Sequence, residues 1–453
     1  PAIMPDQLDE FLREHPLTDS VDLLLPDLSG ILRGKRLPPS ALRGALAGEA
    51  YFTMTVYAID TPGANVAASG LVWEEGDADR PLRLDPGSLR PVPWRPGGAQ
   101  ILGGLADHDG GGFFADPRHV LAKVAEGFAA SGLKPVAALE FEFYLIDQAA
   151  DERGRPQVPA CARLAGQRPA ETEVFVPERF EDQEPFFEQV DRYCEAQGLP
   201  VKGALCEFAP SQFEVNLGHV DDMVAAADHG ALLKRCIKAA ARATGQRATF
   251  MAKPFEEQSG SGLHVHLSLV DRDGRNLFGE TADGERLMRH AVRGLQDLMG
   301  EAMLVFAPNA NSYRRLRPLT YAPTAPTWGW NNRTVALRIP PGPSSARRIE
   351  HRVAGADANP YLVLAAVLAG VLHGLEQRQE PTAPVTGNAY AQAEASLPLT
   401  WEDALAAFRA AGTLPGHLGE RFCRLFAAVR QGERDRFHAR ITPTEHEWYL
   451  TAV

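Results

Sequence analysis

The sequence predicts an α+β protein with two domains, a small β-rich domain over residues 1–112 and a larger domain over residues 113–453. The chain has 453 residues, enough for two or more domains, and its 45% hydrophobic and 23% charged residues are typical of globular proteins. Gly, Pro and Asp are dense between residues 61 and 112, which is typical of loop-rich β domains. Beyond Pro117, segments with helical spacing alternate with short apolar runs, which predicts alternating helices and strands.

The small domain is expected to begin with an amphipathic helix and to consist mainly of short strands. Continuous apolar runs and segments rich in Tyr, Phe, Thr and Val predict the strands. The expected elements are a helix at 7–14, strands at 21–25, 51–59 and 101–105, and a hairpin turn with a basic strand at 30–36.

The larger domain is expected to begin with a helix at Asp116-Pro117, after the glycine run at 110–112. Residues 147–179 are polar and rich in Pro and Gly, so we expect a surface loop near the site. Further expected helices lie at 186–197, 223–244 and 285–299, with three more before the C-terminus. Expected strands lie at 139–146, 249–254, 263–270, 334–339 and 348–353, with paired strand segments within 201–217.

Charge and cysteine content narrow the partners and the compartment. The net charge of −12 argues against nucleic acid or an acidic membrane surface as a partner. The five cysteines form no CxxC pair and no signal-like leader is evident, so we expect a cytoplasmic protein without structural zinc. The longest apolar run, Tyr361–Leu375, is too short to span a bilayer. Asn359-Pro360 before it predicts the N-cap and first turn of a buried helix.

One strand-like run, Leu139-Glu140-Phe141-Glu142-Phe143-Tyr144, carries two acids on one face. Residues two apart on a strand point to the same side, roughly 6–7 Å apart. Glu140 and Glu142 therefore aim at one place, while Phe141 and Phe143 face the core. Two neighbouring carboxylates are costly unless a cation lies between them. A strand at a sheet edge with one solvated face would explain the run equally well, so the case for a site depends on further stretches.

Two later stretches supply further candidates. Between Glu207 and Glu214, a turn at 209–211 could bring both carboxylates over one spot, although surface hairpins with two glutamates are common. After a glycine-containing turn at 259–262, His264 and His266 share one face of a strand. A His-x-His pair is typical of metal or phosphate sites, and two histidines on a solvent face are as frequent.

The last stretch places Arg348, Glu350 and Arg352 on one strand face, either as an ion-pair network or as a metal ligand between phosphate-binding arginines. Arg333 and Arg338 add two cations, more than an ion-pair network alone would need. Together the stretches offer five glutamates and one histidine, and such oxygen-rich ligation suits Mg²⁺ or Mn²⁺. Divalent ions with arginines favour phosphoryl transfer from a nucleotide. The sequence lacks a Walker-type loop, which argues against a P-loop enzyme.

The order and spacing of these motifs resemble the glutamine synthetase superfamily over almost the whole chain. The matching stretches are Glu-Phe-Glu-Phe at 140–143, Glu-x6-Glu at 207–214, Gly-Ser-Gly-Leu-His-Val-His at 260–266, Asn-Ser-Tyr-Arg-Arg-Leu at 311–316, Asn-Arg at 332–333, Arg-Ile-Glu-x-Arg at 348–352 and Ala-Asn-Pro-Tyr at 358–361. The resemblance implies an N-terminal β-grasp domain and a catalytic α/β domain with a curved antiparallel sheet. It also implies a homododecamer of two hexameric rings, with each active site between one catalytic domain and the neighbouring N-terminal domain.

The resemblance also implies a role for each candidate residue. One metal ion would be held by Glu142, Glu207 and Glu214, and a second by Glu140, His264 and Glu350. Glutamate would be bound by Gly260, Arg315 and Arg352, with Ser259 where relatives carry Asn. The phosphates would meet Arg333, Arg338 and Arg348, with His266 and Ser268 near the nucleotide. The γ-carboxylate of L-glutamate would attack ATP, with two or three Mg²⁺ or Mn²⁺ ions per site, and a nitrogen nucleophile would displace phosphate from the acyl phosphate.

Two departures from the family pattern concern the nitrogen substrate. Ammonia-using members carry an aspartate in the N-terminal domain and a glutamate in a later loop, and this chain has Thr53 and Tyr321 at these catalytic positions. The segment 28–36 resembles the branch that joins glutamate to organic amines, the γ-glutamylpolyamine synthetase-like proteins. Trp328 and Trp330 could wall an alkyl-amine tunnel or could be core aromatics.

The resulting hypothesis is an ATP-dependent ligase that joins L-glutamate to an organic amine. One alternative is an ordinary glutamine synthetase in which other groups replace the missing acids. The other is a non-catalytic ring scaffold, although a scaffold has no need of five inward-facing glutamates.

Overall fold

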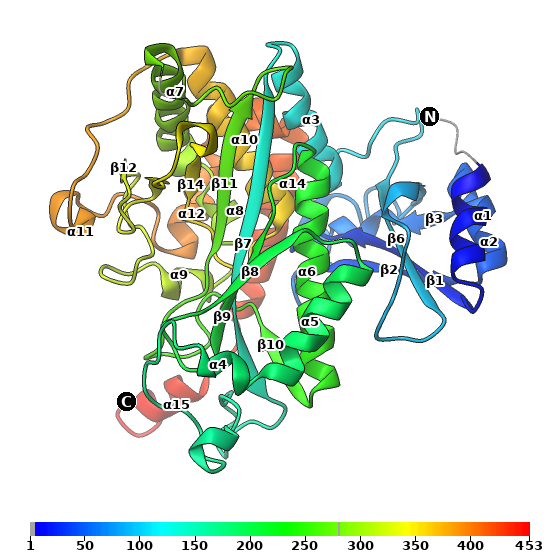
Figure 1. Ribbon diagram of the computed structural model, residues 1–453, viewed down its shortest axis with the longest axis horizontal. Coiled ribbons are helices and arrows are strands. Elements are labelled where there is room, and N and C mark those ends of the chain that lie inside the picture. Colours follow the sequence, from blue (N-terminus) through cyan, green and yellow to red (C-terminus); the bar gives the residue numbers. More distant parts are fainter. Residues whose placement is uncertain (1–4, 280) are drawn as a thin grey trace.

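The computed structural model describes residues 5–279 and 281–453, and its strands form two sheets (Figure 1). The first sheet has the strand order β2-β1-β6-β4-β3, with β5 paired to β6. Its strands are β1 (Ser20–Pro26), β2 (Leu32–Leu37), β3 (Tyr51–Thr53), β4 (Asp79–Leu84), β5 (Arg90–Pro91) and β6 (Gly98–Leu105). β1 and β6 run parallel at its centre, and the other pairs are antiparallel. The predicted strands at 21–25 and 101–105, and the basic strand after Gly30, are confirmed.

One predicted strand of this region is wrong over most of its length. Residues 51–59 were expected to be extended, but the strand ends at Thr53 and Met54–Tyr57 form a 3-10 helix. The Thr53 hydroxyl accepts a hydrogen bond from the Thr55 backbone N–H at 3.2 Å and caps this turn. Met54 and Tyr57 are fully buried. Burial and the cap therefore outweigh the β propensity of the segment.

The second sheet has the order β12-β13-β14-β11-β7-β9-β8, with β10 paired to β7. Its strands are β7 (Lys134–Asp147), β8 (Val201–Cys206), β9 (Gln212–Leu217), β10 (Gln246–Thr249), β11 (Leu263–Val270), β12 (Trp328–Trp330), β13 (Leu337–Ile339) and β14 (Ile349–His351). β7 is paired on both sides, antiparallel to β11 and β9. Figure 1 shows β7 and β11 running side by side through the middle of the molecule.

Helices cover this sheet and form most of the remaining regular structure. The longer ones are α3 (Pro117–Ala129), α5 (Glu184–Ala196), α6 (Met223–Ala243), α7 (Ala282–Met299), α10 (Pro360–Gln377) and α14 (Glu420–His438). The shorter ones are α1 (Pro5–Glu14), α2 (Pro39–Gly44), α4 (Glu178–Glu181), α8 (Met303–Phe306), α9 (Ser312–Arg315), α11 (Ala389–Gln392), α12 (Trp401–Arg409), α13 (Leu414–Leu418) and α15 (Pro443–Tyr449). The expectation of three helices after the last strand is wrong, because α10 to α15 all lie there.

α10 is the apolar core helix that the sequence predicts. The Asn359 side chain caps its first turn by accepting from the N–H groups of Tyr361 and Leu362. By length and composition alone α10 could cross a membrane, but 72% of this apolar segment is buried inside the protein. It packs on α7 and α3. A Cβ at Gly294 would lie 2.1 Å from the Gly370 carbonyl oxygen, so glycine allows α7 and α10 to approach this closely.

Three further strand predictions need correction at their ends. The segment 249–254 is not a strand, because β10 already ends at Thr249 and the Lys253 N–H donates to the Asn311 side chain instead. β13 and β14 are shorter than the predicted 334–339 and 348–353. The strands of the first sheet come from residues 20–105 and those of the second from 134–351, and the domain division at 112/113 stays a prediction.

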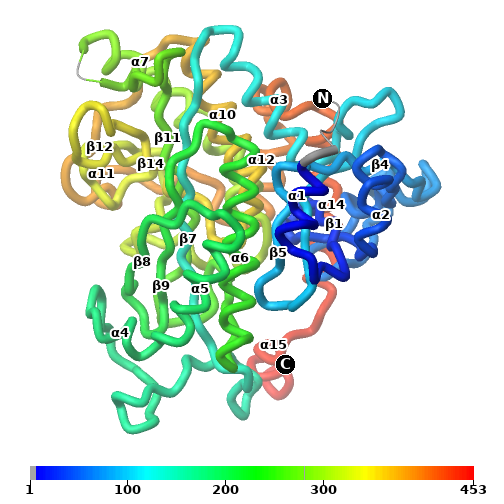
Figure 2. Tube along the Cα trace, turned by 45° about the vertical axis from the view of Figure 1, so that its right-hand side comes forward, coloured from blue at the N-terminus to red at the C-terminus, as the bar shows by residue number. Residues whose placement is uncertain are grey.

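Helix α14, near the C-terminus, packs against the N-terminal region (Figure 2). Arg430 donates a hydrogen bond to the Ser29 hydroxyl at 3.0 Å, and the Thr61 N–H donates to Glu433 at 3.0 Å. These contacts join residues that are about four hundred positions apart in the chain.

Candidate active site

β7 brings the predicted acids together because it lies between β11 and β9. Glu140 stands opposite His264 on β11, and Glu142 stands opposite Glu214 on β9. Phe141 is fully buried on the other face of the strand. The alternation of the sequence is confirmed, and the alternative of an edge strand is wrong, because β7 has a partner on each side.

Three of the acids form a cluster that we call the three-carboxylate group: Glu142, Glu207 and Glu214. Their ligand oxygens lie within 4.8 Å of one another. The Gly262 N–H donates to Glu142 at 2.6 Å, and the Asn216 amide donates to Glu214 at 3.1 Å. Within residues 5–279 and 281–453, no lysine or arginine forms an ion pair with these three side chains.

Burial and neighbouring carboxylates raise the pKa of two members of this group. Burial, and after it the Glu142 carboxylate, raises the pKa of Glu207 to about 7. Burial, followed by the Glu140 and Glu142 carboxylates, raises the pKa of Glu214 to about 11. A divalent cation between these oxygens would remove both penalties, so the donor set fits such an ion.

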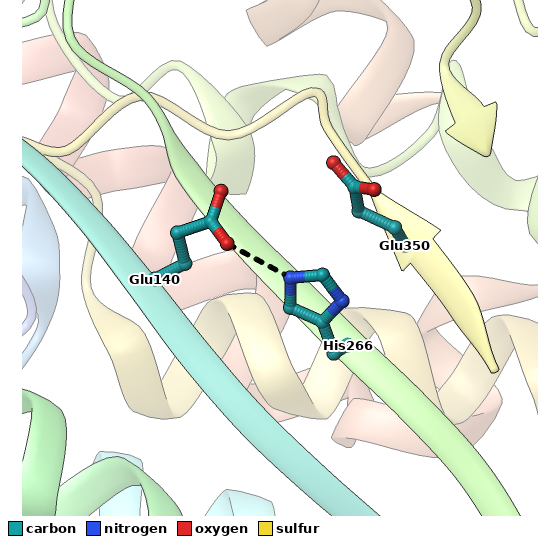
Figure 3. A group of neighbouring side chains, drawn as sticks. All are labelled: Glu140, His266 and Glu350. Atoms are coloured by element: carbon teal, nitrogen blue, oxygen red, sulfur yellow. Dashed lines mark hydrogen bonds and ion pairs between the residues drawn. The ribbon is translucent and has the colours of Figure 1, made fainter. Parts of the chain in front are cut away.

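The remaining candidates form a second cluster, the paired group, in which each acid has a basic partner. Glu140 contacts His264 Nδ1 at 2.7 Å and His266 Nε2 at 3.0 Å. Glu350 accepts from Arg338 at 2.8 Å and also from Arg352. Figure 3 shows Glu140, His266 and Glu350 pointing toward one another from three different strands.

The partners of the paired group hold its carboxylates in the charged form. Burial alone would raise the pKa of Glu140, but the hydrogen bonds from His264 and His266 hold it well below its usual range. For Glu350, the charge of Arg352 outweighs burial and lowers the pKa to about 2. Arg348 Nε donates to His266 Nδ1 at 3.0 Å, so His266 Nε2 carries the proton that it donates to Glu140.

The structure places both histidines around one carboxylate, that of Glu140. The predicted second metal set joined Glu140, His264 and Glu350. In the structure His266, expected near the nucleotide, groups with Glu140 and Glu350 within 4.8 Å, while His264 groups with Glu140 and Glu214. His264 Nδ1 lies 4.0 Å from Glu350. Which histidine would bind a metal ion therefore stays a prediction, and both surround the same carboxylate.

The residues expected to bind glutamate lie beside the carboxylates. Arg315 on α9 is buried and donates to the Val353 carbonyl at 2.9 Å. A Cβ at Gly260 would lie 2.7 Å from Arg315, so the two are adjacent. The Ser259 carbonyl accepts from Tyr144 at 2.6 Å, which fixes the start of the glycine turn.

Of the residues expected near the nucleotide, Ser268 is buried on β11, two and four positions beyond the histidines and on their side of the strand. Arg333 is exposed, and its positive charge opposes the rise in the pKa of Glu207. Arg338 and Arg348 are held by Glu350 and His266.

Thr53 is the last residue of β3 in the first sheet, and Figure 1 shows β3 apart from β7, the strand that carries Glu140 and Glu142. Its hydroxyl and that of Thr55 both donate to Asp77. Asp77 lies 24 positions from Thr53 and no motif marks it, so the sequence gives no signal of this contact. The structure therefore places an acid beside Thr53, although the local stretch has none.

Three aromatic residues, here called the aromatic rim, belong to segments that meet next to Glu207 in the fold: Phe175, Phe208 and Tyr321. Phe208 follows Glu207 directly, is 46% exposed, and its ring centroid lies 6.4 Å from that of Tyr321, which is 51% exposed. The Phe175 N–H donates to the Cys206 carbonyl at 3.2 Å.

Phe175 and Tyr321 have φ values of +63° and +58°, an uncommon conformation for bulky residues that is often found at functional sites. The tryptophans behave differently. Trp328 is fully buried with its indole N–H on Thr382, so it is a core residue and not a tunnel wall, while Trp330 is partly exposed.

Comparison with known proteins identifies the family. The model of the glutamine synthetase catalytic domain matches residues 114–449. The chain belongs to the glutamine synthetase family. It is 41% identical to gamma-glutamylputrescine synthetase PuuA of Escherichia coli (strain K12), covering 98% of this chain and 94% of that protein. It is 33% identical to gamma-glutamylethanolamide synthetase GlnA4 of Streptomyces coelicolor, covering 94% of this chain and 91% of that protein.

A solved structure, a GmaS/ADP complex, aligns with 99% of this chain and 100% of its own with a TM-score of 0.83 and 28% identity. The fold expected from the resemblance is thereby confirmed.

Proposed function

We propose that this chain is an ATP-dependent ligase that joins the γ-carboxylate of L-glutamate to an organic amine through γ-glutamyl phosphate. The observation that carries the proposal is the aromatic rim beside Glu207, with Tyr321 where ammonia-using relatives have a glutamate. Aromatic faces attract cations and bury methylene groups, which an alkylamine has and ammonium lacks. The names of the two similar enzymes, which make γ-glutamyl products from putrescine and ethanolamine, agree with this substrate class.

The site residues are assigned to roles as follows. The three-carboxylate group would hold one Mg²⁺ or Mn²⁺ ion, and Glu140 with His264 and Glu350 would hold a second. Bound ions would neutralise charge on the transferred phosphoryl group. Gly260, Arg315, Arg352 and Ser259 would position L-glutamate, and Arg333, Arg338, Arg348, His266 and Ser268 would hold ATP. The guanidinium groups stabilise negative charge on the phosphoryl oxygens as the γ-carboxylate attacks.

Assembly enters the proposal through Thr53. Thr53 ends β3 of the first sheet, and Asp77 lies in the turn that precedes β4. Because β3 lies away from β7 (Figure 1), a role of these residues in catalysis requires a second copy of the chain. We therefore propose a homododecamer of two hexameric rings in which residues 1–112 of one subunit close the site formed by residues 113–453 of the next. All five cysteines are free thiols, which supports a cytoplasmic location.

Ammonia-dependent glutamine synthesis is the second candidate, and Asp77 is the observation that favours it. An anionic group attracts ammonium and can take up its proton. Asp77 could supply the N-terminal acid that Thr53 lacks. Among the described residues, however, no acid forms a hydrogen bond with Tyr321, which stands at the position of the second acid. Glutamine synthesis from ammonia would therefore have only one of the two anionic groups that bind ammonium in relatives. The proposal of an amine ligase is favoured.

The deciding experiment measures phosphate release with ATP and glutamate, first with ammonium and then with mono-, di- and polyamines. We expect kcat/KM for the best amine to exceed that for ammonium at least about a hundredfold, roughly 2.7 kcal/mol. The double substitution Thr53→Asp with Tyr321→Glu should narrow the gap. Equal use of ammonium would favour glutamine synthesis, and no phosphate release with any nitrogen donor would favour a scaffold.

A further inference from the structure

A cavity of about 580 Å³ lies where the N-terminal region meets the helices of the larger domain. Its wall combines the loop at 29–32 with α6, α12 and α14. The ammonium group of Lys234 on α6 lies 5.7 Å from the ring of Phe141. Phe141 points away from Glu140 and Glu142 on β7, so this cavity lies on the other side of the sheet from the candidate active site.

The cavity wall carries an excess of positive charge. Its lining includes five cationic side chains and two acidic ones, listed as Lys234, Arg235, Lys238, Arg242, Arg430, Asp357 and Glu433. Glu433 is paired with Arg430 at 3.0 Å. Arg235 lies 3.5 Å from Asp22, outside the cavity.

The other three cations repeat every four positions of α6, so that they lie along one face of the helix. Like charges at this spacing destabilise a helix. Among the described residues, Lys234, Lys238 and Arg242 form no ion pair, and the Lys234 ammonium group donates only to the Ala356 carbonyl at 2.7 Å. The charge of Asp357 acts on Lys234, and no carboxylate in the described part of the chain forms an ion pair with Lys238 or Arg242.

Two buried donors in the same wall lack an acceptor. The Arg430 Nε and Trp401 Nε1 atoms are both buried, and neither finds a hydrogen-bond partner among the residues described. Buried donors are usually satisfied, and an unsatisfied one costs stability. The two unpaired donors add hydrogen-bonding groups to the wall, and the row of basic side chains is the observation that calls for a negatively charged ligand.

We infer that this cavity binds a small dianion, of the phosphate or dicarboxylate class, as an effector distinct from the substrates. The volume lies within the range of small-molecule sites, roughly 300–1,000 Å³. Lys238 and Arg242 at the exposed rim attract the ligand, and Lys234 lies deeper. The rings of Phe250 and Trp401 provide apolar wall for the carbon skeleton of an organic anion.

The wall also connects the cavity to the glutamate-binding residues. Asp357 accepts hydrogen bonds from Ser312 at 2.7 Å and from Asn309 at 2.8 Å. Ser312 begins α9, the single turn that ends at Arg315. A dianion that draws the α6 cations inward changes the field at Asp357. The expected functional consequence is a change in KM for glutamate, with KM for ATP less affected.

The test measures the thermal unfolding midpoint of the full chain against inorganic phosphate and, separately, succinate, with NaCl at matched ionic strength as reference. We expect one of the two dianions to raise the midpoint, because a ligand that binds only the folded state stabilises it. Lys238→Gln and Arg242→Gln should each weaken the apparent affinity at least about tenfold. Lys123→Gln, an exposed lysine on α3 outside the cavity, is the matched control and should respond as the wild type does.

The dianion that raises the unfolding midpoint of the wild type more shows whether the cavity prefers phosphate or a dicarboxylate. Three results would overturn the inference. The first is an unfolding midpoint that depends on ionic strength alone. The second is a midpoint that responds to the anion equally in the wild type and in both α6 variants, which would place the anion at the active-site arginines. The third is a change of oligomeric mass in these variants without a change in anion response, which would show that a second copy covers the cavity.

Discussion

The two halves of the carboxylate site differ in how their charge is balanced. In the paired group, Glu140 and Glu350 contact two histidines and two arginines, and the pKa of Glu350 falls to about 2. In the three-carboxylate group no basic side chain of the described chain forms an ion pair, and burial raises the pKa of Glu214 to about 11. Both halves project from the same strand, β7.

The difference shows what each half needs in order to be charged. The paired group is stabilised by the fold itself, so its carboxylates are anionic without help. In the three-carboxylate group the pKa values of Glu207 and Glu214 are raised, and a cation would favour their charged forms, so it is the half open to a ligand from outside. The aromatic rim stands beside Glu207 of this open half, which suggests that cationic substrates approach from the same side.

The largest expected effect comes from the open half. Replacing Glu142 by Ala removes one ligand of the three-carboxylate group, and we expect phosphate release at millimolar Mg²⁺ to fall at least about a thousandfold, roughly 4 kcal/mol. The unfolding midpoint in EDTA should not fall, because a crowded negative charge is relieved. Glu152→Ala, at an exposed glutamate of the 147–179 loop, is the matched control. Full activity of Glu142→Ala would remove the metal assignment.

Stability should separate the two halves more directly. Glu350→Gln leaves Arg338 and Arg352 buried without their carboxylate, and removing one partner of a buried pair costs about 3 kcal/mol or more. Glu214→Gln removes a carboxylate that already has no cation, so no such loss is expected. Thermal unfolding of both variants in EDTA measures the contrast. Equal midpoints would mean that pairing does not distinguish the halves.

The regular elements of the larger sheet were predictable because burial imposes a period. β11 begins and ends where the sequence predicts, and β7 keeps its acids on one face because Phe141 and Phe143 fill the core on the other. Strand predictions failed where a side-chain hydrogen bond or burial took the place of the backbone hydrogen bonds between strands. Thr53 caps a 3-10 turn, and the Lys253 N–H goes to Asn311 instead of a neighbouring strand.

The candidate site was predictable as a set of residues but not as a set of contacts. The residue spacing in the sequence predicted that the five glutamates would lie together, because each of them lies on or next to a paired strand. Spacing could not decide between His264 and His266, because both lie on one face of β11 and both reach Glu140. Asp77 and Phe208 were missed, since the first reaches Thr53 only through the fold and the second has no partner until Tyr321 adopts a positive φ.

A substitution in the aromatic rim tests whether the amine binds next to the three-carboxylate group. Phe208→Ala removes exposed aromatic surface next to Glu207, and we expect kcat/KM for the best amine to fall about tenfold, or 1.4 kcal/mol, through loss of apolar and cation–π contact. Ammonium has no alkyl part and is the internal control, so its kcat/KM should change little. An equal loss for both substrates would show that Phe208 only supports the position of Glu207.

The smallest expected effect concerns Lys234, a buried lysine that forms no ion pair with a carboxylate among the described residues. It is the converse of the three-carboxylate group, whose buried acids form no ion pair with a cation. Burial, and after it the charge of Lys238, lowers the pKa of Lys234 to about 7 from an ordinary value of 10.5. Between these values the unfolded chain binds a proton that the folded chain has released, so this residue makes stability rise with pH from about 7 to about 10.5. Its contribution is lost again as the pH falls toward 7. From pH 7 to pH 8 the gain stays below about 1.4 kcal/mol, the limit for one proton. Lys234→Met should flatten this rise in urea unfolding measured at both pH values, and an unchanged pH dependence in the variant would show that Lys234 remains charged in the folded protein.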